Sequence, residues 1–229
     1  MNSSVKMIDM PTKEQRQLMK TMEKLFRQKY AIVAKKHSFK NISFNTFKVR
    51  NDFFFYSFVH LNNLALFDNY LEIIVNLQVK PMKADELYWE IFDLNENKKQ
   101  PLSFRANGCF VVQGQTLIER ESITFKSLIP NEENLTEIIE AGFELINNEI
   151  DTFLKQCTIE TFDVNKFKYV GLVNDQALMA MLLLIANGNY KEALDLVNYQ
   201  LTQNEKGKYY KSDGTSMYEL VKKYCEKKI

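Results

Sequence analysis

Residues 70–80 read YLEIIVNLQVK, and apolar residues recur in this stretch at every second position. The apolar set is Leu71, Ile73, Val75, Leu77 and Val79, and the intervening polar set is Glu72, Asn76, Gln78 and Lys80. A period of two predicts a β-strand with one buried face. Because the strands of parallel sheets are buried on both faces, a one-sided strand indicates an antiparallel or mixed sheet.

The aromatic stretch before this strand predicts a β-hairpin. We expect strands at about 42–50 and 53–62, joined at Asn51-Asp52, because Asn and Asp tolerate the positive φ that tight turns require. The second strand, FFFYSFVHL, is apolar on both faces and leaves two registers open, since a slip of one residue exchanges the faces. A two-residue turn places Phe47 and Val49 on the face of Phe54, Tyr56 and Phe58, and a three-residue loop places them on the face of Phe53 and Phe55.

Helical spacing and capping residues predict the other elements. Capping boxes at Thr12/Gln15 and Ser216/Glu219 begin the first and last helices. Further helices are expected over about 83–94, 132–156, 174–187 and 190–204, and further strands over 102–112 and 116–126, the second nearer a sheet edge. The expected fold is α+β: a mostly antiparallel sheet of about five strands packed with helices, followed by an all-helical C-terminal segment.

Residues 158–173 show no firm periodicity and are the best candidate for a boundary. We therefore expect a sheet domain over 1–157 and a helical segment over 158–229. The pattern ANGNYKEALDLV resembles the helix–turn–helix of a tetratricopeptide unit, but it occurs once, and such repeats need about three copies to form a stable array. An ordinary antiparallel helix pair is the prediction.

Composition limits the classes of function. The chain of 229 residues has a net charge of +1, which gives no bulk reason to expect nucleic acid or an anionic membrane as a partner. Its three cysteines are far apart and fit neither a disulfide framework nor a zinc pattern, which favours a reducing compartment. With no apolar leader and no apolar stretch long enough to cross a bilayer, a cytoplasmic location is predicted.

Recognisable catalytic motifs are absent from the sequence, and no cofactor or metal is expected. Both histidines, His37 and His60, fit structural roles better than catalytic ones. The tightest acidic group, Asp85, Glu86, Glu90 and Asp93 around Trp89, is typical of a solvated helix surface. The alternative is a metal-independent hydrolase that uses His60 with Asp85, Glu86 or Glu90.

A second alternative is binding of single-stranded nucleic acid. Basic residues are interleaved with aromatic ones between Lys35 and Arg50, a pattern that can support base stacking. The basic residues are Lys35, Lys36, Lys40, Lys48 and Arg50, and the aromatic ones are Phe39, Phe44 and Phe47.

The surplus of aromatic residues, seventeen Phe and eleven Tyr, is the positive indication of function. If helices cover one sheet face, the other must meet the C-terminal helices or a partner protein. The sequence leaves this choice and the oligomeric state open. The candidate partner-binding residues are Phe53, Phe55, Tyr56, Trp89 and Tyr190.

In layout, the first 157 residues resemble a loose group of bacterial α+β domains of unknown function. The residues that carry the likeness are Lys48–Tyr56, Tyr70–Val79 and Asp85–Phe92. Some members of such groups are similar to immunity proteins, which bind and block a toxin. The resemblance implies a non-catalytic cytoplasmic binding protein, in agreement with the hypothesis drawn from the residues.

Overall fold

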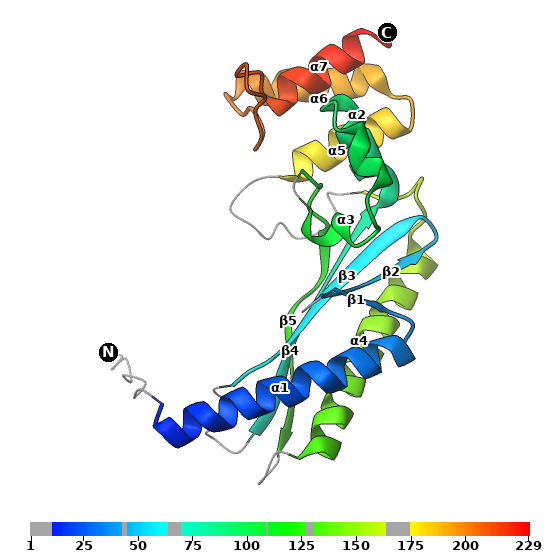
Figure 1. The fold of residues 1–229 in the computed structure, drawn as a ribbon. Coiled ribbons are helices and arrows are strands. Elements are labelled where there is room, and N and C mark those ends of the chain that lie inside the picture. Colours follow the sequence, from blue (N-terminus) through cyan, green and yellow to red (C-terminus); the bar gives the residue numbers. More distant parts are fainter. Residues whose placement is uncertain (1–10, 43–44, 64–69, 109, 127–130, 164–174) are drawn as a thin grey trace, which may run out of the picture.

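The computed structural model describes residues 11–42, 45–63, 70–108, 110–126 and 131–163, and residues 175–229 (Figure 1). It contains a five-stranded antiparallel sheet in which each strand pairs with the next along the chain. This is the α+β fold that the alternating pattern predicts. The strands are β1 (Lys40–Ile42), β2 (Asn45–Arg50), β3 (Phe53–Leu61), β4 (Tyr70–Pro81) and β5 (Gln115–Lys126).

The β2–β3 hairpin adopts the register of a two-residue turn. Asn51 and Asp52 have φ of 49° and 62°, and Val49 pairs with Phe54. Of the two registers that the sequence leaves open, this one places Val49 on the face of Phe54. The opposite face receives Phe53 and Phe55.

Helices α1 (Lys13–Lys36) and α4 (Glu132–Gln156) pack against each other and cover one face of the sheet, which we call the helix face. The capping box predicted at Thr12 and Gln15 begins α1. Gly142 lets α4 approach the strands closely, because a Cβ there would lie 2.8 Å from the end of the Ile73 side chain.

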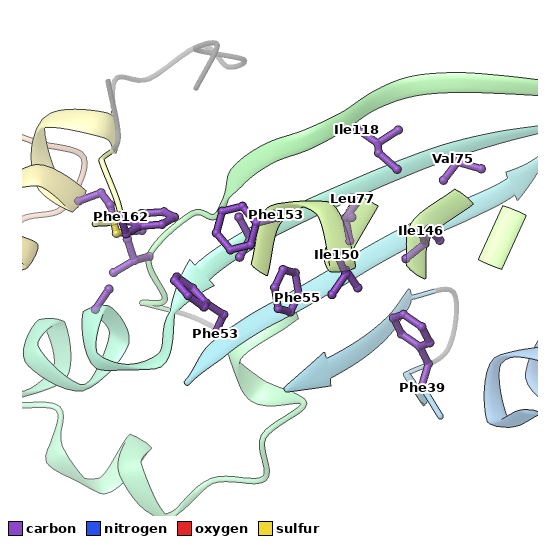
Figure 2. Close-up of a cluster of buried hydrophobic side chains, with 14 of the residues drawn as sticks. Phe39, Phe53, Phe55, Val75, Leu77, Ile118, Ile146, Ile150, Phe153 and Phe162 are labelled. Atoms are coloured by element: carbon purple, nitrogen blue, oxygen red, sulfur yellow. The ribbon is translucent and has the colours of Figure 1, made fainter. Parts of the chain in front are cut away.

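The main core lies between the helix face and α4. Figure 2 shows Ile146, Ile150 and Phe153 of α4 lying over strand residues such as Leu77 and Phe55. The Phe153 ring meets the Phe53 ring edge-on at 5.0 Å, a favoured aromatic geometry.

A chain of buried hydroxyl groups joins α1 to the strands beneath it. The Tyr30 hydroxyl lies 3.2 Å from Thr46 Oγ1, which lies 2.7 Å from Ser57 Oγ. Burial raises the pKa of Tyr30 to about 12, although the hydroxyl groups of Thr46 and Ser57 act in the opposite direction.

The strand predicted over 102–112 is wrong. Its described residues contain a single turn of helix, α3 (Phe104–Asn107), and no strand, and a short 3₁₀ helix, η2 (Asn95–Lys99), precedes them. The fifth strand is instead β1, immediately after α1. The polar side chain of Arg105 is buried in an ionic cluster described below, and this tertiary contact overrides the local β pattern.

Helix α2 (Met82–Ile91) begins directly where β4 ends, with Pro81 as its N-cap residue at φ −62°. Helices α5 and α7 pack against α2, which runs from the end of the sheet toward the C-terminal helices (Figure 1). The predicted helix pair is therefore present but is attached mainly through α2. The C-terminal helices are α5 (Asp175–Ala186), α6 (Tyr190–Thr202) and α7 (Met217–Glu226), the last with the predicted capping box.

Strand β5 lies at the sheet edge, as expected, and it is not regular. Its pairing with β4 shifts between Val75 and Gln78, and Arg120 has φ of 52°. The Arg120 backbone N–H donates to Asn76 Oδ1 at 3.1 Å instead of continuing the ladder. The strand therefore bulges in its middle.

The turn geometry predicts the effect of substitutions at Asp52. Asp52→Gly should raise the free energy of unfolding, because glycine has no penalty at positive φ. Asp52→Val should lower it by about 1–2 kcal/mol, since a β-branched residue is strained there. Denaturant unfolding measures both changes. Equal stability of the two variants would contradict the two-residue turn.

Candidate binding face of the sheet

The sheet face opposite α1 and α4, which we call the second face, is covered over only part of its area. Phe54 is fully buried there, whereas Phe58, four residues further along β3, is 41% exposed. Val49 on β2 is 38% exposed. The cover comes from the segment between α2 and β5, residues 95–108 and 110–114, which we call the cap (Figure 1).

The buried ammonium group of Lys80 attaches the cap to the sheet. Lys80 lies at the end of β4, and its Nζ is 2.9 Å from Asp85 Oδ2 at the start of α2. Two backbone carbonyl oxygens of the cap, those of Arg105 and Val112, accept hydrogen bonds from Nζ at 2.8 and 2.7 Å. The ammonium has three N–H donors, and these three partners use all of them.

The electrostatic environment of Lys80 is governed by its complete burial. Burial lowers its pKa, and the Asp85 carboxylate counteracts this effect. Arg105 adds a second cation, with its guanidinium 3.4 Å from Asp85 Oδ2 and donating to the Met82 carbonyl at 2.8 Å. A buried charge is tolerated only when it is paired and hydrogen-bonded. The cluster therefore requires the cap, α2 and β4 together.

Aromatic residues add further attachments. The Trp89 indole N–H donates to the Phe110 carbonyl at 2.7 Å, and the Arg105 guanidinium lies 4.9 Å from the indole ring centre. At the end of the cap, the Gly114 N–H donates to the Tyr56 hydroxyl at 3.0 Å. A Cβ at Gly114 would lie 2.8 Å from the Tyr56 ring, so the close approach requires glycine.

Beyond the cap, the second face presents a set of side chains that we call the open half: Val49, Phe58, His60, Ile74 and Arg120. Phe58 and Val49 are exposed, and His60 and Ile74 are partly exposed. The Phe58 and His60 rings lie 5.0 Å apart. Burial, with a smaller contribution from Arg120, lowers the pKa of His60, so this side chain is neutral at pH 7.

Three of the predicted partner-binding residues are inaccessible. Phe53 and Phe55 lie on the helix face beneath α4, and Trp89 is enclosed by the cap. Tyr56 is partly exposed beside the cap, and Tyr190 is partly exposed on α6. The five residues therefore do not form one surface.

The acidic group on α2 is not a free solvated surface. Asp85 is paired with Lys80, and Glu86 lies 3.3 Å from the Arg105 guanidinium. Glu90 accepts a hydrogen bond from the Tyr224 hydroxyl of α7 at 2.9 Å, and this bond is the main cause of its lowered pKa. Asp93 pairs with Lys211. These carboxylates join α2 to the cap and to the C-terminal part of the chain.

The structure does not bring His60 close to these carboxylates. His60 pairs with Ile74, which precedes Lys80 by six residues on β4, a separation of about 20 Å along the strand. Its Nδ1 atom has no hydrogen-bond partner among the described residues. A general base needs a reaction partner within hydrogen-bond reach. The geometry therefore offers no support for the His60–carboxylate alternative.

Hollows on the surface lie elsewhere. One of about 250 Å³ lies between β5 and the end of α4 and includes Cys157, and one of about 470 Å³ lies against α6 and α7. A third, of about 300 Å³, includes Glu86. None of the three contains a histidine. Within the described ranges, no group of three or more His, Cys, Asp or Glu residues is arranged to hold a metal ion.

The basic and aromatic cluster between Lys35 and Arg50 is largely engaged with α4. Lys36 pairs with Glu140 at 2.7 Å, Lys48 donates to Asn147 at 3.1 Å, and Arg50 pairs with Asp151 at 2.5 Å. Phe39 and Phe47 are buried, and Phe44 lies outside the described residues. No stacking surface for bases is formed by the described part of this cluster.

The sequence analysis missed Phe58 and Arg120 as surface residues and Lys80 as a buried one. The two-residue turn does place Phe58 with Val49, but the pattern cannot say which face the helices cover. A signal for Lys80 was available: a lysine next to the apolar end of a strand, five residues before an aspartate, at a strand–helix junction.

The chain matches no family model, no curated protein and no solved structure. None of the helices in the described ranges is both long and apolar enough to cross a membrane.

The ionic cluster predicts strong coupling between Lys80 and Asp85. Lys80→Met alone should lower the free energy of unfolding by about 3–5 kcal/mol, because it leaves a buried carboxylate without its main partner. The double variant Lys80→Met/Asp85→Leu should lose less free energy of unfolding than the two single variants lose together. The difference should be about 1–3 kcal/mol. Denaturant unfolding of all four proteins measures this difference.

The matched control for Lys80 is Lys99→Met, which removes an exposed ion pair to Glu96 and should change stability by less than about 1 kcal/mol. Additive effects of the Lys80 and Asp85 substitutions would contradict the described cluster.

The ion pairs of Glu140 should account for part of the loss of stability at low pH. Burial raises its pKa, but hydrogen bonds from Lys36 and His37 outweigh burial and hold the pKa below the ordinary 4.5. The stabilisation is therefore complete above about pH 4.5 and is lost as the pH falls through the folded-state value. Glu140→Gln should lower the melting temperature at pH 7 and flatten its decline below pH 4.5. An unchanged acid limb in a series of melting curves would refute this role.

Proposed function

We propose that this protein is a non-catalytic binding protein that recognises a protein partner through the open half of the second face. The observation that carries the proposal is the exposure of Phe58 and Val49 on a paired sheet surface beside the cap. Exposed aromatic residues on a preformed surface are typical energetic centres of protein interfaces. An interface there needs no rearrangement of the strands.

The chemistry of the open half suits protein recognition better than catalysis. Its polar members are His60, which is neutral, and Arg120, which is charged, and the amides of Asn76 and Gln78 lie beside them on the same face of β4. Such a mixture of aromatic, amide and histidine side chains combines apolar anchors with adaptable hydrogen bonding.

The class of partner that we propose is a protein toxin, with this chain as its immunity protein. Support comes from the layout-level likeness of residues 1–157 to immunity-type bacterial domains and from the uncapped sheet face. We place this activity in the cytoplasm on the ground of the cysteine pattern. The hydrolase and nucleic-acid alternatives gain no supporting observation.

Affinity capture tests the binding face. The immobilised protein should retain a specific partner from lysate of its own source organism, and Phe58→Ala should weaken binding by about 30-fold, the effect of losing an anchor worth about 2 kcal/mol. The free energy of unfolding should change by no more than about 1 kcal/mol, because the side chain is 41% exposed and the strand is paired on both sides. The captured protein is identified by mass spectrometry and titrated against both variants.

The matched control is Tyr199→Ala, which removes an aromatic side chain that is 60% exposed on α6, away from the sheet. It should leave partner binding unchanged. A partner that is retained equally by the Phe58 variant but lost by the Tyr199 variant would move the binding site to the C-terminal helices.

A further inference from the structure

The two helices of the helix layer carry opposite charge on their outer surfaces. Helix α1 has eight Lys and Arg residues against two Glu, and α4 has seven Asp and Glu residues against one Lys. The whole chain has a net charge of only +1. Within the helix layer, positive and negative charge are therefore segregated between two neighbouring helices.

Within the chain, part of this charge is neutralised where α1 and α4 meet. Lys29 pairs with Glu132 at 2.9 Å, and Lys36 pairs with Glu140 at 2.7 Å. These contacts define the side of α1 that faces α4.

Away from that contact, each helix has an exposed stripe of one sign. The basic stripe is Lys13, Lys20, Lys24 and Lys35 on α1, and the acidic stripe is Glu133, Glu137 and Glu144 on α4. At 100° per residue, each stripe lies on the side of its helix opposite the buried residues. None of these seven side chains has an ion-pair partner among the described residues.

Only the end members of the stripes, Lys35 in the last turn of α1 and Glu133 in the first turn of α4, suit the dipole of their own helix. Lys20 and Lys24 are four residues apart, as are Glu133 and Glu137, and like charges at this spacing are mildly destabilising. An opposite charge lying against either stripe would relieve this repulsion.

An apolar seam borders the basic stripe. Leu18, Leu25 and Ile32 recur every seven residues on the flank of α1 between the basic stripe and the side that faces α4. Ile32 is 66% exposed and Leu18 is 40% exposed. Apolar side chains at this spacing are typical of helices that pack against another helix.

We propose that this chain self-associates through the helix layer, with the basic stripe of one copy against the acidic stripe of another. A two-fold axis that passes between the stripes brings each α1 over the partner copy's α4, so both stripes are neutralised at once. The apolar seams meet near the axis and supply the contact that charge alone cannot. The open half lies on the other side of the sheet and stays accessible.

Ionic strength and charge reversal test this proposal by sedimentation equilibrium. Wild-type protein should self-associate in about 0.01 M NaCl, where the Debye length is about 30 Å, and dissociate in about 1 M NaCl, where it is about 3 Å. Lys20→Glu/Lys24→Glu alone and Glu137→Lys/Glu144→Lys alone should each be monomeric at low salt. Lys and Glu have similar helix propensity, so both variants should fold, which circular dichroism verifies.

The most decisive measurements combine the two charge-reversal double variants. An equimolar mixture of the two double variants should form a heterodimer, and the quadruple variant should recover self-association, because opposite stripes again face each other. Ile32→Ser should weaken association at every salt concentration. The control Lys206→Glu/Lys208→Glu changes the same charge in the loop before α7 and should associate as the wild type does.

The proposal would be overturned by a monomeric wild type at low salt, by association that survives reversal of either stripe, or by a mixture that does not form a heterodimer. The proposal would also be overturned if monomeric protein bound heparin through Lys20 and Lys24. That result would indicate that the basic stripe binds a polyanion instead.

Discussion

The ammonium group of Lys80 is buried at the point where β4 meets α2 and the cap, and the arrangement of the second face depends on it. Removing a charge from water has a large free-energy cost, and here the compensation comes from one carboxylate and two backbone carbonyls. Those carbonyls belong to a segment with little regular structure. The charge therefore requires the cap to occupy one position, and the cap in turn divides the second face into a covered part and the open half.

Helix α2 connects the Lys80 cluster to the C-terminal helices. Its first turn provides Asp85, and its later residues contact α5 and α7 or accept the hydrogen bond from Tyr224. The C-terminal helices are thus held to the sheet by polar contacts as well as by apolar packing. The proposed partner face and the charged helix layer lie on opposite sides of the same sheet, so two associations could occur without competing for one surface.

Much of the fold followed from local rules. The alternation in β4, both capping boxes and the apolar stripe of α4 each predict an element that the structure contains. The cap was mispredicted because Arg105 and the backbone around it are organised by Lys80 and Asp85, which lie 20 or more residues earlier in the chain. Pattern analysis within a window cannot detect such a partnership.

The candidate site was only partly predictable for a related reason. An aromatic binding surface was expected, but the residues chosen, Phe53 and Phe55, are on the face that α4 covers. Alternation in β3 separates the two faces and says nothing about which of them a distant helix will occupy. The choice is made by the turn at Asn51-Asp52, by Gly142 on α4 and by the cap, acting together.

The bulge in β5 has a consequence for solubility. An edge strand of twelve residues with a regular, unpaired backbone would be a template for uncontrolled sheet growth between molecules. In this chain the middle of the edge is interrupted at Arg120, where the backbone turns to the left-handed region, and it is flanked by the charged side chains of Glu119 and Glu121. A strand from another molecule could not pair along the whole edge, because the backbone is irregular at Arg120 and carries charged side chains on either side. The bulge therefore protects β5 against amyloid-like stacking. The other edge of β5 still pairs with β4.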